Sequence, residues 1–371
     1  MLFTEWFPDR SPIYNIYKSY RDNFEAGPYF PLDLPPRPIP PKTQWISFLD
    51  QRLLSPFGVA AGPLLHSRWV ALAAALGFDV LVYKTIRSRE YPGHSFPNML
   101  YLDLPGMIPL NAFPSVAKTT TRPPHHMEDL AVAHSFDMPS KNPQYLLEDI
   151  PRAQAFLKEG QLLIVSVTGT HREECSLLRD FVDAAALARA AGAKVIEINF
   201  SLRSTKDQED ALYTSPSHVL EMGLVLAKAM DPIPLILKVG VFDSVRRMRD
   251  VFIAAAKAGI RAISGIDGLL MRIENREGNP AFSQEQFRPR VGGGPIRNVA
   301  LHFVEQAHQI IKEEKLDLEL IGVGGITKHE HFFHFLERGA RIAMSATGMM
   351  WDPLLAMRAH AYIDQRKRMA G

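Results

Sequence analysis

The sequence predicts a (β/α)8 barrel with an N-terminal arm and long insertions on the C-terminal face. Eight short apolar runs are typical of strands, at roughly 57–61, 79–84, 162–168, 194–200, 234–239, 261–266, 318–323 and 341–346. Amphipathic stretches with apolar residues three and four apart lie between them, at 67–76, 175–191, 217–230, 245–258, 296–314 and 328–338. This alternation indicates parallel strands with helical crossovers, and eight such units favour a closed barrel over an open doubly wound sheet.

Two connections are longer than loops usually are. About 75 residues follow the second strand and about 50 follow the sixth. Both leave the C-terminal ends of strands, where insertions shape binding sites. Ahead of the barrel domain at 46–371, residues 1–45 form a proline-rich arm with one expected helix at 14–24. The arm could cover the barrel bottom or pair two subunits in a homodimer, and the residues leave both open.

Composition excludes several classes of protein. The chain has 371 residues, of which 46% are hydrophobic, so it can bury a large core. With 42 basic and 40 acidic residues, and no basic stretch interleaved with aromatics, nucleic acid is not an expected partner. Cys175 is the only cysteine, which argues for a reducing, cytoplasmic setting without intrachain disulfides. Neither a signal peptide nor a membrane-spanning run is expected.

The last two predicted strands end in small residues. The segments that contain the ends of these two strands and the small residues after them are Ile321-Gly-Val-Gly-Gly-Ile326 and Arg341-Ile-Ala-Met-Ser-Ala-Thr-Gly348. Small residues leave backbone N–H groups within reach of a ligand, and a (β/α)8 barrel commonly holds a phosphate between its seventh and eighth strands. We therefore expect a phosphate-bearing small molecule at this position.

Polar side chains end three other strands. Lys84 and Lys238 would place ammonium groups above dry strands, which is costly unless an anion or an electron-rich ligand meets them. A single terminal lysine can instead extend to water, but two of them beside the phosphate loops favour ligand contact. Asn199 can donate and accept hydrogen bonds toward a planar heterocycle, or simply cap a turn.

Other polar residues carry less information about function. His329, His331 and His334 fall on one predicted helix without a completing carboxylate, so we expect a solvated helix and no metal site. Cys175 is expected to be a small buried filler.

Several short segments, in this order, resemble one known family. They are Ser55-Pro-Phe-Gly-Val-Ala-Ala-Gly62, Tyr83-Lys-Thr85, Ile164-Val-Ser-Val-Thr-Gly169, Gly192-Ala-Lys-Val-Ile-Glu-Ile-Asn-Phe-Ser201, Leu237-Lys238, Gly292-Gly-Gly294, Ile321-Gly-Val-Gly-Gly-Ile326 and Ser345-Ala-Thr347. From about Leu54 to Pro353 the chain resembles the dihydroorotate dehydrogenase family of FMN-binding barrels. Its Lys-Thr pair is most similar to that of the soluble class 1 enzymes.

The resemblance implies a set of cofactor contacts. The residues implied for FMN are Ala60, Ala61, Gly62, Lys84, Thr85, Asn199, Lys238, Gly293, Gly324, Gly325, Ala346 and Thr347. Ala60 to Gly62 would lie beside the flavin ring, Lys84 and Thr85 at its edge, and Asn199 and Lys238 on its polar side. Gly293 would border the cofactor, and the last four residues would receive the phosphate. The implied substrate residues are His134, Ser135, Asp137, Met138, Asn199 and Ser264.

The substrate side departs from the family pattern. Leu202 stands where the family has a catalytic Cys or Ser, and leucine cannot accept a proton. We name Ser204, His134 and Lys84 as candidate catalytic residues, with Ser201 as a further hydroxyl that a shifted loop could bring into reach. His134 replaces a family asparagine and Asp137 a glycine, and Ser264 replaces a second asparagine.

The preferred hypothesis is an FMN-dependent oxidoreductase acting on dihydroorotate or a related cyclic pyrimidine by hydride transfer to flavin N5. One alternative is a flavin-binding protein that has lost turnover and serves a binding or regulatory role. Another is a non-redox barrel that binds a sugar phosphate through the same last two loops.

Overall fold

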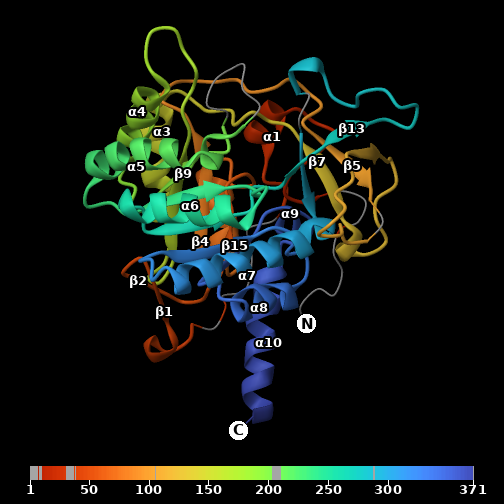
Figure 1. The fold of residues 1–371 in the computed structure, drawn as a ribbon. Helices are drawn as coiled ribbons and strands as arrows, with labels where there is room; N and C mark the ends of the chain where they lie inside the picture. The colour runs from red at the N-terminus through yellow and green to blue at the C-terminus, as the bar shows by residue number, and fades with distance from the viewer. Residues whose placement is uncertain are drawn as a thin grey trace.

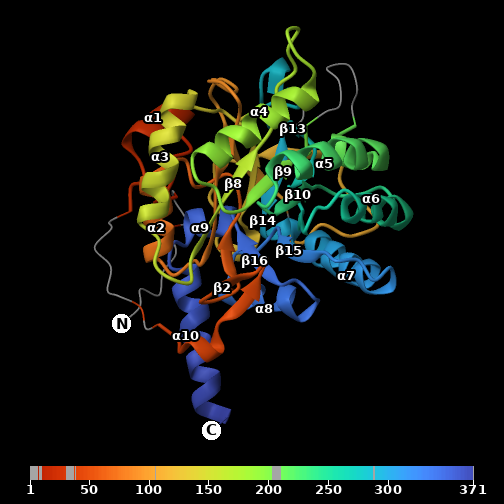
Figure 2. The ribbon, with the colours of Figure 1, turned by 90° about the vertical axis from the view of Figure 1, so that its left-hand side faces the viewer.

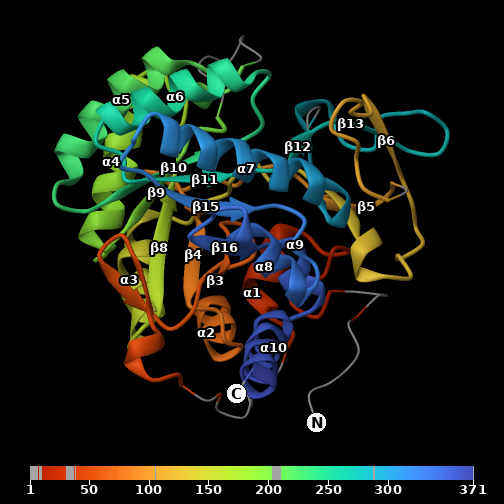
Figure 3. The ribbon, with the colours of Figure 1, turned by 60° about the horizontal axis from the view of Figure 1, so that its bottom comes forward.

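The computed structural model describes residues 7, 11–30, 37, 39–104, 106–202, 210–286 and 289–370, with the backbone alone at 285 and 367–370. Its centre is a closed barrel of eight parallel strands (Figures 1 and 3). The strands are β3 (Phe57–Val59), β4 (Val80–Ile86), β8 (Leu162–Val167), β9 (Ile196–Asn199), β10 (Leu235–Val239), β11 (Ala262–Gly265), β15 (Glu319–Val323) and β16 (Ile342–Ser345). Every strand expected from the sequence is present, within two residues at each end.

Helices surround the barrel in the order that the crossovers require (Figure 3). Those expected from the sequence are α2 (Ser67–Ala75), α4 (Leu177–Ala190), α5 (Pro216–Met230), α6 (Val245–Lys257), α7 (Arg297–Glu313) and α8 (His329–Glu337). Further helices are α3 (Pro143–Ala155), α9 (Thr347–Trp351) and α10 (Leu355–Ala370). Short 3₁₀ turns are η1 (Lys42–Gln44), η2 (Met127–Asp129), η3 (Leu212–Thr214), η4 (Gln284–Gln286) and η5 (Gly294–Ile296).

Strand alternation separates two apolar layers. Residues such as Val80, Val82 and Ile236 fill the barrel interior, whereas their neighbours Leu81 and Leu237 pack outward against the helices. Toward the C-terminal ends of the strands the inward side chains become polar. They are Lys84, Ser166, Glu197, Asn199, Lys238 and Ser264, all of them buried.

The bottom of the barrel is closed by an antiparallel hairpin of β1 (Ile46–Phe48) and β2 (Gln51–Leu53). Phe48, Leu49 and Leu53 pack into the interior cluster and are at most 1% exposed. Helix α10 extends away from this same end of the molecule, as Figures 1 and 2 show. The hairpin therefore excludes water from the barrel at the end opposite the strand C-termini.

The arm contains one helix, but not where the sequence pattern placed it. Helix α1 (Tyr20–Ala26) begins with a capping box between Ser19 and Asp22, so the expected start at residue 14 is wrong. Residues 11–19 pack as irregular chain, with Ser11 accepting hydrogen bonds from the backbone N–H groups of Ile13 and Tyr14. Part of the proline-rich segment, at residues 31–36 and 38, lies outside the described residues.

The two long insertions together build a second sheet, which the sequence analysis did not anticipate. Its strands are β5 (Met99–Asp103), β6 (Val116–Thr119), β7 (Ala131–His134), β12 (Leu269–Leu270), β13 (Arg272–Glu274) and β14 (Arg290–Gly293), in the order β12-β14-β7-β5-β6-β13. Strand β14 of the second insertion pairs with β7 of the first, with Arg290 opposite His134. This pairing brings side chains from the two insertions to one place above the barrel.

Among the helices of the described residues, none combines the length and apolar character that a membrane crossing requires.

Candidate functional site

A cavity of about 440 Å3 opens at the C-terminal ends of the barrel strands, beneath the second sheet. Its volume lies within the range of about 300–1,000 Å3 common for small-molecule and cofactor sites. Predicted cofactor residues that line it are Ala61, Gly62, Lys84, Thr85, Asn199, Ala346 and Thr347. Predicted substrate residues that line it are His134, Ser135, Asp137 and Met138.

The other predicted residues lie around this cavity. Ala60, Lys238 and Ser264 are buried in the upper barrel, where Lys238 is the register partner of both Asn199 and Ser264. Gly293 ends β14, and the Cβ position of its neighbour Gly292 lies 3.0 Å from Oγ1 of Thr347. Ser204 lies outside the described residues.

The loop after β15 needs glycine where the sequence predicted a phosphate site. Gly325 has φ +74°, and a Cβ there would lie 2.5 Å from the Cα of Arg297. Glycine at this position lets the loop pack closely against Arg297 at the start of α7, and phosphate binding through the backbone N–H groups of the loop stays a prediction.

Lys84 projects from β4 into a dry part of the cavity. Burial, and then the nearby Arg87, lower the pKa of the Lys84 ammonium to about 8. The next residue, Thr85, shares a 3.0 Å hydrogen bond with the hydroxyl of Ser166. An electron-rich ring edge would offset the cost of burying this ammonium.

A charged cluster forms the opposite wall. Nε of Arg290 lies 2.9 Å from Oδ2 of Asp267, and Nζ of Lys238 lies 3.9 Å from Oδ1 of the same carboxylate. Burial raises the pKa of Asp267, but Arg290 and Lys238 outweigh it, so the net pKa lies below its usual value. Arg290 also donates to the backbone carbonyl of Ser201 at 3.1 Å, which connects β14 to the loop after β9.

His134 ends β7 beside this cluster. Burial, and then the positive charge of Arg290, lower the pKa of its imidazole to about 4. The ring is therefore neutral near pH 7, and one of its two nitrogens can accept a proton or a hydrogen bond.

Arg87 holds the loop that follows β7. Its buried guanidinium donates to the carbonyls of Asp137 and Met138 at 3.0 and 3.1 Å, and to the carbonyl of Gly169 at 2.7 Å. Asp137 and Met138 both have left-handed backbones, with φ +54° and +50°. Non-glycine residues adopt this conformation at a cost that the surrounding contacts must offset, and such strain gathers at functional sites.

The structure corrects two expectations about isolated residues. His331 is 3% exposed rather than solvated, and its Nδ1 lies 3.3 and 3.2 Å from the backbone nitrogens of Thr327 and Lys328. Cys175 is half-buried and precedes α4, with its sulfur 3.0 Å from Nη2 of Arg172, so it is not a fully buried filler. Within the described residues, no three His, Cys, Asp or Glu side chains gather as metal ligands.

Several residues that line the cavity were missed by the sequence analysis. They are Tyr14, Tyr20, His94, His171, Asp267, Gln286 and Arg290. Asp267 follows a predicted strand, so its position at a strand end was a usable signal. His171 lies in the loop after β8, three residues beyond the predicted strand at 162–168. The others lie in the arm and the insertions, where no periodic pattern indicates what faces the barrel.

The fold and cavity define a (β/α)8 barrel with a cavity of small-molecule size at the C-terminal ends of its strands. No protein-family model matches the chain. A dihydroorotate dehydrogenase of Dictyostelium discoideum is 44% identical over 366 residues, covering 96% of this chain and 98% of that protein. The chain therefore belongs to the dihydroorotate dehydrogenase family, as its motifs indicated.

More distant relatives carry more specific names. The catalytic subunit of dihydroorotate dehydrogenase B (NAD(+)) of Desulforudis audaxviator is 28% identical over 71% of this chain and 82% of its own length. Dihydroorotate dehydrogenase A (fumarate) of Limosilactobacillus reuteri is 27% identical over 45% of this chain and 52% of its own length.

Proposed function

We propose that this chain is an FMN-dependent oxidoreductase that oxidises dihydroorotate, or a closely related dihydropyrimidine, at a CH–CH bond. The observation that carries the proposal is the 44% identity to a dihydroorotate dehydrogenase along nearly the whole chain. The cavity at the strand ends supports it, because predicted cofactor and substrate residues face the same space.

The residues present fit a flavin mononucleotide. Ala61 and Gly62 offer small side chains beside a flat ring, and a Cβ on Gly62 would meet no other atom within 4 Å. Lys84 and Lys238 are buried cations that suit the electron-rich edge of such a ring. The Gly324-Gly325 loop and the start of α9 would receive the phosphate.

When bound, the flavin supplies an acceptor for a hydride at N5. The chain's own residues would bind and orient the substrate against it. Asn199 accepts a 3.0 Å hydrogen bond from the backbone N–H of Ser201 through its Oδ1. This bond orients the Asn199 amide, whose Nδ2 lies 3.6 Å from the sulfur of Met138. Lys238, which is buried, would stabilise negative charge that develops on the ring.

Purified protein tests the proposal directly. We expect flavin absorbance in a 1:1 ratio with protein, and bleaching of that absorbance when dihydroorotate is added without oxygen. Flavin that is bound but not reduced by dihydroorotate would contradict the proposed reaction and favour the binding or regulatory alternative. Absence of flavin after reconstitution with FMN would contradict the cofactor.

The same proposal includes three expectations about the protein as a whole: its location, its oligomeric state and its division into domains. We infer that the protein is cytoplasmic, that it forms a homodimer, and that residues 1–45 are an arm distinct from the barrel domain. Light scattering on the purified protein measures the oligomeric state, and a variant lacking residues 1–45 tests whether the remaining chain folds and keeps flavin.

A further inference from the structure

Oxidation of dihydroorotate requires removal of a proton from the ring carbon beside a carbonyl, and Leu202 cannot accept it. Leu202 lines the cavity, so a side chain without a proton-accepting atom occupies this position. If the proposed function holds, another group in the cavity must act as the base. The inference below rests on that function.

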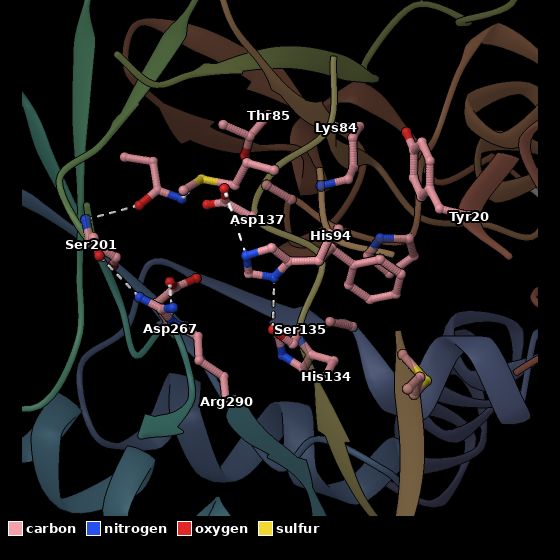
Figure 4. A pocket seen from close by; sticks show the side chains of 18 of the residues that line it. Tyr20, Lys84, Thr85, His94, His134, Ser135, Asp137, Ser201, Asp267 and Arg290 are labelled. Carbon is pink, nitrogen blue, oxygen red and sulfur yellow. Dashed lines mark hydrogen bonds and ion pairs between the residues drawn. The ribbon is translucent and has the colours of Figure 1, made fainter. Parts of the chain in front are cut away.

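Ser135, His94 and Asp137 are aligned along one wall of the cavity (Figure 4). Oγ of Ser135 lies 3.0 Å from Nδ1 of His94, and Nε2 of His94 lies 3.8 Å from Oδ2 of Asp137. With the ring proton on Nε2, His94 accepts from the serine hydroxyl and directs its N–H toward the carboxylate. This is the order of groups by which a histidine activates a hydroxyl as a base or nucleophile.

The backbone brings the two loops together firmly. Tyr91 and Ser140 exchange a pair of 2.8 Å backbone hydrogen bonds, and the N–H of His94 donates to the carbonyl of Phe136 at 3.0 Å. Gly93 has φ +70°, and a Cβ there would lie 2.3 Å from the same carbonyl. The close approach that glycine permits places the imidazole of His94 above Ser135.

The serine itself is fixed by its backbone. Its N–H donates to the carbonyl of Asn98 at 2.9 Å, and its own carbonyl accepts from the side-chain amides of Asn98 and Gln286, both at 3.3 Å. These contacts occupy the backbone of Ser135 and leave its hydroxyl for His94 and for a ligand.

The carboxylate of Asp137 is also held in place by its neighbours. Tyr91 donates its hydroxyl to Oδ2 of Asp137, and a guanidinium nitrogen of Arg87 lies 3.5 Å from Oδ1. Asp137 therefore serves as a positioning residue, because its contact is with His94 rather than with the reacting carbon.

We propose that Ser135 is the catalytic base of this enzyme and that His94, oriented by Asp137, accepts the proton of its hydroxyl. The substrate C–H beside the carbonyl gives its proton to Oγ of Ser135, whose own proton passes to Nδ1 of His94. The remaining electron pair forms the ring C=C bond as the hydrogen of the neighbouring carbon leaves as a hydride to flavin N5. The substrate loses two electrons, the flavin gains them, and the imidazolium remains beside the carboxylate of Asp137.

Other groups in the cavity are less suited to this step. His134 faces the guanidinium of Arg290, which opposes a second positive charge, and its pKa of about 4 makes it a weak base. The backbone nitrogen of Ser201 is held by Asn199, and its hydroxyl has no histidine within hydrogen-bond reach among the described residues. Burial lowers the pKa of Lys84 only to about 8, so near pH 7 the ammonium is mostly protonated and cannot accept the proton.

Stopped-flow reduction of the flavin by dihydroorotate, without oxygen, tests the proposal across a range of pH. We expect Ser135→Ala to slow reduction by about 100- to 10,000-fold while substrate affinity, read from the flavin spectrum, changes by less than about tenfold. Ser115→Ala and His125→Asn, both at exposed positions of the same insertion, are the matched controls. Flavin content reports whether each variant folds.

Two further variants separate proton transfer from structural support. Ser135→Cys should restore part of the rate, with a pH dependence that follows a thiol of pKa about 8.5. His94→Asn can still contact the serine hydroxyl but cannot take its proton, so it should slow reduction about as much as Ser135→Ala. In protein without flavin, the NMR chemical shift of His94 Nδ1 should change in Ser135→Ala, because the 3.0 Å contact with the serine hydroxyl is lost, and stay unchanged in Ser115→Ala. Among the described residues, the titratable or charged groups that line this cavity include Tyr20, Lys84, His94, His134, Asp137, His171, Asp267 and Arg290, and Arg87 and Tyr91 contact Asp137.

Different results would contradict the assignment of Ser135 as the base and the proposed function. Wild-type protein that is never reduced by dihydroorotate contradicts the function. Wild-type protein that is reduced, together with a Ser135→Ala variant that is reduced equally fast, overturns the base assignment. A large loss in Ser201→Ala or Ser204→Ala with none in Ser135→Ala would overturn it too, and would assign the base to the loop after β9.

Discussion

Replacement of Arg87 by methionine should destabilise the protein measurably, because this one buried side chain serves four acceptors. Its guanidinium donates to the backbone carbonyls of Asp137, Met138 and Gly169 and to the hydroxyl of Thr170, at 2.7–3.1 Å. Methionine fills much of the same volume but donates nothing. The carbonyls then lose their partner in a region that water reaches poorly.

The expected magnitude follows from these contacts. Removing one partner of a buried charged network costs about 3–5 kcal/mol. Unfolding entropy of about 2.1 cal/mol/K per residue over 371 residues amounts to about 0.8 kcal/mol/K. We therefore expect the melting temperature of Arg87→Met to fall by about 4–6 °C.

Calorimetry or circular dichroism of the holoprotein measures this shift. Arg89→Met is the matched control, since Arg89 is exposed and lies two residues away on the same segment. A surface substitution of this kind changes stability by about 0.5 kcal/mol or less, which is under about 1 °C here. If Arg87→Met melted within 1 °C of the control, the guanidinium could not be holding the loop at 137–138 as described.

Three further predictions concern pH, the phosphate loop and the buried lysine. Burial lowers the pKa of the His134 imidazole to about 4 from an ordinary value near 6.5, so between these pH values the unfolded chain binds a proton that the folded protein does not. The free energy of unfolding is therefore highest above about pH 6.5 and decreases as pH falls toward 4. His134→Gln should therefore raise the melting temperature relative to wild type at pH 4.5 more than at pH 7.5, whereas His125→Gln should show no such difference. Gly325→Ala should lose bound flavin and about 1–3 kcal/mol of stability, because its backbone has φ +74° and the new Cβ would lie 2.5 Å from the Cα of Arg297. The control Gly106→Ala has a similar φ of +64° but nothing within 4 Å, so its measured flavin-to-protein ratio should stay normal. Lys238→Met should make the flavin midpoint potential more negative, and a potential equal to that of wild type in a spectroelectrochemical titration would contradict contact between this ammonium and the ring.

The sequence by itself determined the barrel and much of its mouth. A strand of three to seven residues followed by a helix is a local pattern, and eight repeats of it leave little choice of architecture. Lys84 and Asn199 were found because strand ends are local too, and the C-terminal ends of parallel strands in a barrel must meet, whereas Thr85 came from the family resemblance.

Only the tertiary structure decided what covers that mouth. The second sheet consists of strands of two to five residues from two insertions, too short for a periodic signal and paired across more than a hundred residues of chain. The pairing of β14 with β7 places Arg290 opposite His134, and the approach of Gly93 to Phe136 places His94 over Ser135. Such contacts depend on how distant loops fold against each other. The family pattern could therefore indicate His134 and Ser135, which line the cavity, but not the contacts that Arg290 and His94 make with them.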